Sequence, residues 1–473
     1  MASYYIENFG CRAARADGEA ISARLNAAGM TEAAVGDASV VVLNTCSVTA
    51  EADRDARAFV RKTMRLNPAA KVVVTGCYAQ RAPEEIAALP GVTAVIGNSH
   101  KGLAPEIIRG LVLPANEVKS TLLPTASLLT GGSGIWADES FAHSYIEDAQ
   151  VLPGLQTRPN LKIQEGCANR CTFCIIPTTR GASRSLSAEK VLAQVRGFVA
   201  AGGHELVLSG INLGQWGREF TTKQSLAGLL RQILGETELP RLRLSSIEPM
   251  DWTADLVALF REPRVARHAH LPLQSGSDAV LRRMHRRYRP WHYEQKVAML
   301  AEAVGPALAI GADVMVGFPG ETDAEFRETW ELIDRLPFTY LHLFPFSPRP
   351  GTPGWELHRQ SPVPAAAVSE RMAALRTLIA EKSLRFRRRF IGEALPAITL
   401  HTPPALAAQG RSSALTDNFL PAEVAGNVPA NLLIEIHIDG INEGGTLLGY
   451  SPTSFAAASN NLVRTVADRA PVK

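Results

Sequence analysis

Short apolar runs of strand length alternate with helix-like segments along the first hundred residues. Four runs rich in Val, Ile, Tyr or Phe have the composition of buried strands: residues 4–9, 39–44, 71–75 and 93–97. The helix-like segments 18–28 and 52–66 separate the first three of them. This β-α-β-α-β order predicts an open parallel α/β domain with right-handed crossovers.

A second alternation of strands and helices begins at residue 161 and continues past residue 340. Six runs are candidate strands: 161–164, 205–209, 241–247, 268–273, 312–317 and 340–346. Six βα units are fewer than the eight of a closed barrel, so we expect a partial, TIM-like (βα)6 barrel. Functional side chains are expected at the carboxyl ends of its strands.

The remaining segments lack this alternation. Gly and Pro interrupt the periodicity between the two alternating regions, which indicates a linker. After a helix-like segment at 365–389, short alternating runs broken by Pro and Gly predict a small β-barrel. The predicted fold class is therefore α/β. We expect four parts: an open α/β domain at 1–115, a linker at 116–158, a partial barrel at 159–390 and a β-barrel at 391–473.

Composition adds little to this picture beyond the class of protein. The 473 residues are 46% hydrophobic and 20% charged, which is typical of a globular multidomain chain. A net charge of +3 is too small to indicate nucleic-acid binding by itself. The sequence has neither a signal-peptide pattern nor a run of about 18 apolar residues, so we expect a cytoplasmic protein that does not enter a membrane.

Three of the six cysteines lie in one loop directly after the first strand of the second alternation. Cys167, Cys171 and Cys174 have the spacing Cys-x3-Cys-x2-Cys. Three thiolates without a fourth suit a 4Fe-4S cluster that keeps one iron open for another ligand. Zinc normally takes four Cys or His ligands, and residues 164–184 contain no histidine and no fourth cysteine, so zinc would need a remote ligand.

The other three cysteines each follow a strand of the first alternation. Cys11, Cys46 and Cys77 come after the runs at 4–9, 39–44 and 71–75. Because the carboxyl ends of parallel strands meet at one edge of a sheet, these thiols are expected to converge there. The alternative is that they are three unrelated small residues of the core, where free cysteine is often buried.

The cysteine loop at 167–174 resembles that of the radical S-adenosylmethionine (SAM) enzymes. The runs Asn-Thr-Cys-Ser-Val-Thr at 44–49, Thr-Gly-Cys-Tyr-Ala-Gln at 75–80 and Gly-Phe-Pro-Gly-Glu-Thr at 317–322 are similar to motifs of the methylthiotransferase branch. The resemblance covers essentially the whole chain. It implies two catalytic 4Fe-4S clusters, one on Cys167, Cys171 and Cys174 that binds and cleaves SAM, and one on Cys11, Cys46 and Cys77 that carries the sulfur.

Two further runs bear on the substrate that the resemblance implies. Residues 209–214 and 346–353 are most similar to the branch that acts on N6-threonylcarbamoyladenosine 37 of tRNA. Other branches modify isopentenyladenosine 37 or an aspartate of a ribosomal protein, and these stay as alternatives. From another class, an RNA-binding module with purely structural clusters is also compatible. The C-terminal segment resembles the RNA-binding TRAM domain, so the expected partners are the tRNA anticodon loop and an electron donor such as flavodoxin or ferredoxin.

Contacts to SAM are expected from residues that end strands of the partial barrel. These candidates are Ser209, Gly210, Asn212, Glu248, Asp313, Gly317 and Phe318. Gly, Ser, Asn and Asp are also the ordinary residues of turns, which is the competing explanation for most of them.

Basic residues cluster in two places, where they would suit RNA phosphates. The clusters are Arg282, Arg283, Arg286, Arg287 and Arg289, and the arginines within 385–389. One segment departs from the family, which usually has Asn-Gln shortly after the first cysteine. This chain has Arg12-Ala13-Ala14-Arg15 there, so the positioning of groups around the second cluster is expected to differ.

Overall fold

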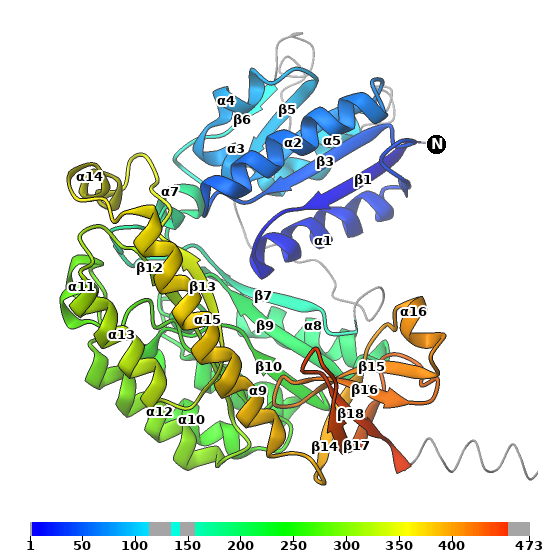
Figure 1. The fold of residues 1–473 in the computed structure, drawn as a ribbon. Helices are drawn as coiled ribbons and strands as arrows, with labels where there is room; N and C mark the ends of the chain where they lie inside the picture. The colour runs from blue at the N-terminus through cyan, green and yellow to red at the C-terminus, as the bar shows by residue number, and fades with distance from the viewer. Residues whose placement is uncertain (1, 113–133, 142–156, 453–473) are drawn as a thin grey trace, which may run out of the picture.

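The computed structural model describes residues 2–112, 134–141 and 157–452, and they form three units (Figure 1). An α/β unit at the N-terminus lies over a partial barrel, and a small β-barrel lies at one end of that partial barrel. The fold class predicted from the sequence is therefore confirmed.

The N-terminal unit is a parallel sheet of strand order β2-β1-β3-β4-β5-β6. Its strands are β1 (Ser3–Asn8), β2 (Thr31–Glu32), β3 (Val40–Thr45), β4 (Lys71–Gly76), β5 (Val92–Gly97) and β6 (Gly134–Trp136). Its helices are α1 (Arg12–Ala27), α2 (Ala50–Leu66), α3 (Cys77–Arg81), α4 (Pro83–Ala87), the 3-10 turn η1 (Lys101–Leu103) and α5 (Ala104–Val112).

Apolar side chains cover both faces of this sheet. Ile21 of α1 and Ile107 of α5 pack on one face, whereas Val60 of α2 and Ile86 of α4 pack on the other. β2 and β3, the two strands that follow β1 in the chain, lie on opposite sides of β1 in the sheet, so the strand order changes direction at β1. In doubly wound sheets ligands bind at such a switch point, beyond the carboxyl ends of the strands.

Two strands of this sheet were not expected from the sequence. β2 has only two residues and β6 has only three, so neither is long enough to show a period. β6 pairs with β5 and lies inside the range 116–158, for which the sequence indicates a linker. The rest of that range, residues 116–133 and 142–156, lies outside the described residues.

The partial barrel contains all six strands expected from the sequence. They are β7 (Asn160–Glu165), β9 (Glu205–Gly210), β10 (Arg241–Leu244), β11 (His268–His270), β12 (Ala309–Val316) and β13 (Phe338–Pro345). They form two sheets, β10-β9-β7-β8 and β11-β12-β13, which a bridge between Leu242 and Val265 joins. The short β8 (Arg184–Ser185) pairs antiparallel with β7 at the edge.

Helices cover the outside of the partial barrel around a core that includes Trp216, Trp252 and Tyr293. They are α7 (Ile176–Arg180), α8 (Ala188–Ala200), α9 (Leu226–Glu236), α10 (Ala254–Ala258), α11 (Asp278–Arg283), α12 (Pro290–Val304), α13 (Asp323–Arg335), α14 (Pro353–Gln360) and α15 (Ala365–Arg388). Helix α1 of the N-terminal unit packs against β7 and β9, so the two units are in direct contact.

The C-terminal strands close into a barrel of order β14-β15-β16-β18-β17. They are β14 (Ala394–Thr399), β15 (Arg411–Thr416), β16 (Pro421–Ala425), β17 (Leu433–Ile441) and β18 (Leu447–Tyr450), with the short helix α16 (Pro404–Ala407) after β14. Residues 453–473, which the sequence assigns to the same domain, lie outside the described residues.

The turn between β15 and β16 docks this barrel onto the partial barrel. Arg267 donates from Nε and Nη2 to the two carboxylate oxygens of Asp417, at 2.6 and 3.0 Å. The ring of Phe419 stacks on His268 with centroids 4.3 Å apart. The β-barrel is thus held against the start of β11, at Arg267 and His268.

Within the described ranges, we find no helix with both the length and the apolar character needed to cross a membrane.

Candidate functional site

The three cysteines of the N-terminal unit meet at the carboxyl edge of its sheet. Cys11, Cys46 and Cys77 follow β1, β3 and β4, which are adjacent strands. Gly10 has a φ of +115° and lies so close to Cys46 that a Cβ at this position would be 2.5 Å from the Cβ of Cys46. Burial, together with the neighbouring thiols of Cys77 and Cys11, raises the pKa of Cys46 to about 12.

This thiol set is open on one side. Cys11 is exposed, whereas Cys46 and Cys77 are buried. The backbone N–H of Val48 donates to the sulfur of Cys46 at 3.5 Å. Asn98, just after β5, donates from Nδ2 both to the sulfur of Cys77 at 3.4 Å and to the carbonyl of Thr179 at 2.8 Å. The last contact connects this set to the partial barrel.

The second set of cysteines follows β7, and N–H groups surround two of its sulfurs. The sulfur of Cys167 accepts from the backbone of Asn169 at 3.4 Å and from Asn212 Nδ2 at 3.7 Å. The sulfur of Cys171 accepts from Arg286 Nη1 at 3.2 Å. Burial raises the pKa of Cys174 to about 12, with the other two thiols beside it. Such donors stabilise thiolates, the form that binds metal.

A cleft of about 650 Å³ opens beside this second set. Its lining includes Asn169, Cys171, Ser183, Gln215, Glu248 and Arg286. This volume and polar lining suit a cofactor of moderate size.

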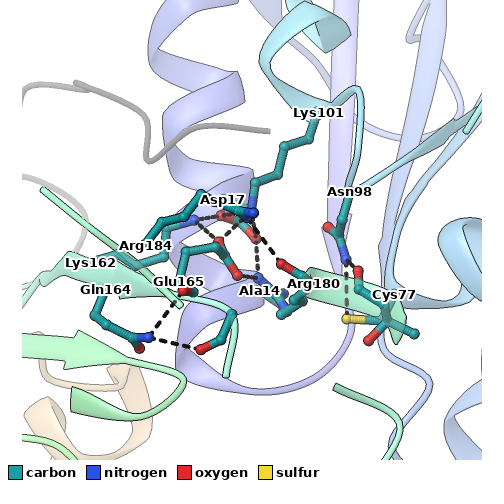
Figure 2. Close-up of polar contacts among 12 residues, drawn as sticks. Ala14, Asp17, Cys77, Asn98, Lys101, Lys162, Gln164, Glu165, Arg180 and Arg184 are labelled. Carbon is teal, nitrogen blue, oxygen red and sulfur yellow. Dashed lines mark hydrogen bonds and ion pairs between the residues drawn. The ribbon is translucent and has the colours of Figure 1, made fainter. Parts of the chain in front are cut away.

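Figure 2 shows a buried group of charged residues near Cys77 of the N-terminal set. Arg180 ends α7, the helix that begins two residues after Cys174, and its side chain is 0% exposed. Its Nη1 donates to Asp17 of α1 at 3.1 Å and to Glu165 of β7 at 2.6 Å. Helix α1 and the cysteine loop of the partial barrel are therefore tied to the same guanidinium.

Two lysines complete this charged group. Lys162 lies 2.6 Å from Glu165 and also contacts Asp17, and Lys101 pairs with both carboxylates. Burial alone would raise the pKa of Glu165, but Arg180, Lys101 and Lys162 hold that pKa well below its usual value. The three cations outnumber the two carboxylates, so excess positive charge remains in a buried place.

The excess charge faces the thiols of the N-terminal unit. Among the described residues, Nε and Nη2 of Arg180 have no hydrogen-bond partner although they are buried. Burial alone would lower the pKa of Arg180, but Cys77, Glu165, Asp17 and Cys11 hold it well above its usual value, which places the guanidinium beside the thiols. Buried N–H groups without acceptors are costly, so the residues present fit an anionic group held by these cysteines.

Four of the other seven candidate residues lie near the second cysteine set. Asn212 contacts Cys167 and its backbone N–H donates to Gln164 at 2.7 Å, while Gly210 packs against the same Gln164. Ser209 Oγ and Asn212 Oδ1 are buried and have no partner among the described residues. Glu248 lines the cleft and accepts from Arg286 Nη2 at 2.5 Å.

Asp313 makes its polar contacts elsewhere. His270 and His342 each lie 3.2 Å from the same oxygen of Asp313, and the ligand atoms of the three lie within 4.8 Å of one another. Such a group could hold a metal ion, but Arg12 and Arg243 add positive charge nearby, which disfavours a cation.

Gly317 and Phe318 form the turn after β12. The N–H of Gly317 donates to Glu321 at 2.8 Å, and Gly317 has a φ of +76°, where a Cβ would lie 2.5 Å from Val368. Phe318 is buried and packs edge-on against Phe346 at 5.5 Å. These two residues shape the turn through packing and backbone geometry.

The structure corrects the interpretation of one member of the first arginine cluster, Arg286, whereas Arg282 and Arg287 are exposed. Arg286 is 6% exposed and donates to Cys171 and Glu248, so it cannot contact RNA phosphates. Arg283 pairs with Glu325 and Arg282 with Asp278.

The buried charges around Arg180 were missed by the sequence analysis. A signal existed, because Lys162 and Glu165 are charged residues in a strand that also carries the core residues Leu161 and Ile163.

Two family models match this chain. Residues 3–97 match the uncharacterized protein family UPF0004, and residues 161–333 match the radical SAM superfamily. Among solved structures, the chain is similar to the radical SAM methyltransferase TsrM from Kitasatospora setae, with a TM-score of 0.55 and 16% identity over 76% of this chain and 78% of that one. That likeness concerns the fold alone. The fold and the cysteine loop thus define a radical SAM enzyme.

Curated relatives narrow the class. The chain is 34% identical to the threonylcarbamoyladenosine tRNA methylthiotransferase MtaB of Bacillus subtilis, over 90% of this chain and 91% of that protein. It is 33% identical to the MtaB of Aquifex aeolicus, over 92% and 99%. It is 35% identical to the tRNA-2-methylthio-N(6)-dimethylallyladenosine synthase of Thermobifida fusca, over 82% and 76%. The chain belongs to the radical SAM tRNA methylthiotransferase family.

Proposed function

We propose that this enzyme replaces the C2 hydrogen of N6-threonylcarbamoyladenosine 37 in tRNA with a methylthio group. The observation that carries the proposal is the presence of two three-cysteine sets at the carboxyl ends of strands in adjoining units, linked through α7 and Arg180. One set suits radical generation and the other suits sulfur transfer. The relatives named for this substrate support the choice of RNA.

The first set, Cys167, Cys171 and Cys174, would hold a 4Fe-4S cluster. A reduced cluster held there would supply the electron for reductive cleavage of SAM, which yields the radical chemistry needed to remove the hydrogen at C2. Asn169, Asn212 and Arg286 direct N–H groups at these sulfurs and stabilise their negative charge.

Around this set, residues of the cleft and of nearby strand ends would bind SAM. Glu248 lines the cleft, and Ser209, Gly210 and Asn212 end β9 beside the cysteine loop. Ser209 Oγ and Asn212 Oδ1 have no hydrogen-bond partner among the described residues, so both could hydrogen-bond a ligand. Gly317 and Phe318 would shape the turn after β12. Asp313 would contribute indirectly, because it would orient the imidazole rings of His270 and His342.

The second set, Cys11, Cys46 and Cys77, would hold a second 4Fe-4S cluster that carries the sulfur. Cys46 and Cys77 are buried, whereas Cys11 is exposed, so RNA can approach from the side of Cys11. Arg180 would donate from Nε and Nη2 to this anionic group, and Asn98 would keep Cys77 in place.

The domain organisation that we propose follows this division of labour. Residues 1–115 would carry the sulfur-transfer set and 159–390 the radical set. The range 391–473 would contain the TRAM-like barrel that binds RNA, and 116–158 would connect the first two parts and also supply β6. Arg385, Arg388 and Arg389 are exposed at the start of that barrel, where they can meet phosphates. A flavodoxin or ferredoxin would supply the electron.

Iron quantitation tests the two-cluster part of the proposal. After anaerobic reconstitution we expect about eight iron atoms per chain, and about four when either cysteine set is changed to alanine. Zinc alone would contradict the proposal.

The substrate is tested by mass spectrometry of tRNA nucleosides from a deletion strain. Loss of the methylthio form of threonylcarbamoyladenosine is expected, whereas loss of the isopentenyl form alone, or no change, would contradict it.

A further inference from the structure

Arg12 extends from the N-terminal unit to the other two units. It directly follows Cys11 and begins α1. Its guanidinium carbon lies 6.0 Å from the ring centroid of Phe419, in the turn that docks the C-terminal barrel. Tyr340 of β13 lies 5.5 Å from the same ring and also close to Arg12. A side chain next to a cysteine of the sulfur-transfer set thus faces the inner side of the partial barrel.

Asp313 near Arg12 and Glu205 beside the neighbouring Arg243 already have other partners. Glu205 accepts from Arg243 Nε at 2.7 Å and pairs with Arg158 at 3.6 Å. Asp313 lies between His270 and His342. The acidic side chains of this region are therefore occupied by neighbouring cations and imidazoles.

Arg12 itself has no hydrogen-bond acceptor or ion-pair partner among the residues that the structure describes. Arg243 lies on the same phenyl ring, with its guanidinium carbon 5.5 Å from the centroid of Phe419, and adds a like charge. Arg12 is nevertheless exposed, so a ligand in solution can reach it. An exposed guanidinium without an acceptor, in a positive field, favours an anion.

We propose that Arg12 binds the carboxylate of the threonylcarbamoyl group on the substrate adenosine. This inference rests on the proposed function. The sulfur must reach C2 of the adenine from the cysteine set that includes Cys11, and the threonylcarbamoyl group is attached to N6 of the same six-membered ring. Its carboxylate therefore lies within about one side-chain length of the reacting carbon, and the arginine that directly follows Cys11 has a side chain of that length.

The neighbours of Arg12 suit the rest of that group. The side chain of His342 is 60% exposed and lies beside Asp313, so its ring can hydrogen-bond the hydroxyl or the ureido N–H of threonylcarbamoyl. An isopentenyl group has no atoms that use these partners. Arg12 would thus select the charged substrate over the apolar one as well as hold it in place.

A thermodynamic cycle tests this role with the reconstituted enzyme. The RNA probes are anticodon stem-loops that carry either N6-threonylcarbamoyladenosine at position 37 or its carboxyl methyl ester. The variants are Arg12→Met, Arg12→Lys and the control Arg15→Met, which lies on the same helix, is 57% exposed and pairs with Glu19. Dissociation constants and methylthiolation rates are measured for each pair, with iron content as the check on assembly.

For the wild-type enzyme and Arg15→Met, we expect the acid RNA to bind about 10- to 100-fold more tightly than the ester RNA, as for a charge-assisted hydrogen bond. In Arg12→Met this difference should fall to less than about threefold at unchanged iron content, and Arg12→Lys should restore part of it.

Two results would overturn the role of Arg12. Equal weakening of both RNAs in Arg12→Met would mean that Arg12 contacts backbone phosphate, and an unchanged ratio would mean that it makes no contact with the carboxylate. If wild-type enzyme fails to convert the acid RNA at all, the proposed function fails and this inference fails with it.

Discussion

Arg180 and Glu165 form an ion pair in which Nη1 lies 2.6 Å from Oε1 and both side chains are 0% exposed. Glu165 ends β7 two residues before Cys167, and Arg180 ends α7 six residues after Cys174. The pair therefore closes the cysteine loop of the partial barrel on itself. The same guanidinium lies beside Cys77 and Cys11, so one side chain connects the flank of one cysteine loop with the thiols of the other set.

Arg180→Met should damage the N-terminal cysteine set more than the radical SAM set. It leaves Glu165 and Asp17 buried with one cation fewer, and loss of such a partner typically costs about 3–5 kcal/mol of unfolding free energy. The donors aimed at Cys77 also disappear. We expect reconstituted iron to fall from about eight toward about four atoms per chain.

Arg196→Met is the matched control, since Arg196 is 54% exposed and pairs with Glu236 at 3.0 Å. It should change the unfolding free energy by less than about 0.5 kcal/mol and leave the iron content unchanged. Full iron content in Arg180→Met would show that Arg180 does not support the second cluster.

The buried carboxylates should make stability depend on pH in acid. Neighbouring cations hold the pKa of Glu165 well below its ordinary value of 4.5 and also lower that of Asp17. Below about pH 4.5 the unfolded chain takes up protons that the folded chain does not, so this contribution to stability is present at neutral pH and is lost as the pH falls.

Glu165→Gln removes one of these carboxylates and isolates its part of the effect. The difference in unfolding free energy between wild type and Glu165→Gln should be largest at pH 7 and should shrink as the pH falls below about 4.5. Denaturant titrations at several pH values measure it. A difference that stays constant or grows in acid would show that Glu165 is not ionised in the folded protein.

Arg286→Met should impair the radical SAM set. Arg286 donates to the sulfur of Cys171 at 3.2 Å and to Glu248 at 2.5 Å. Removal of this positive donor destabilises the reduced, more negative form of the bound cluster, so its reduction potential should become more negative. We expect reductive cleavage of SAM to 5′-deoxyadenosine to slow by about tenfold or more, one unit of log rate for each 1.4 kcal/mol lost.

Arg282→Met serves as the control, because Arg282 is 63% exposed and pairs with Asp278. It should leave both the potential and the cleavage rate unchanged. A normal potential in Arg286→Met would show that its guanidinium does not act on the cluster.

The sequence was sufficient for the parts of the fold that repeat a period. The strands at β3, β4 and β5 are long apolar runs, and each precedes turn residues, so their order and direction could be predicted. The six strands of the partial barrel were also predicted, although β10 (Arg241–Leu244) and β11 (His268–His270) are short and partly polar, because helix-like segments alternate with them. β2 and β6 were not predicted, because a strand of two or three residues is too short to show a hydrophobic period. They are recognised as strands only by their pairing with β1 and β5.

The site was predictable where one residue type carries the chemistry, and less so where burial decides the role. Cysteines have few uses in such spacings, so both sets could be named. Arg286 was predicted to contact RNA, because an arginine-rich run does not show which of its side chains are exposed. In the structure Arg286 is buried and donates to the sulfur of Cys171. Arg180 and Asp17 are 163 positions apart in the chain, and only the packing of α1 on β7 brings them together.

The most direct test of the central claim is nucleoside mass spectrometry of a defined RNA after reaction with the reconstituted enzyme, SAM, a sulfur source and a reductant. Two stem-loops are compared, one with N6-threonylcarbamoyladenosine and one with N6-isopentenyladenosine at position 37. We predict that the first gains a 2-methylthio group, with formation of 5′-deoxyadenosine, and that the second stays unmodified. Methylthiolation of the isopentenyl RNA in preference to the first, or SAM cleavage without any modified RNA, would contradict the account.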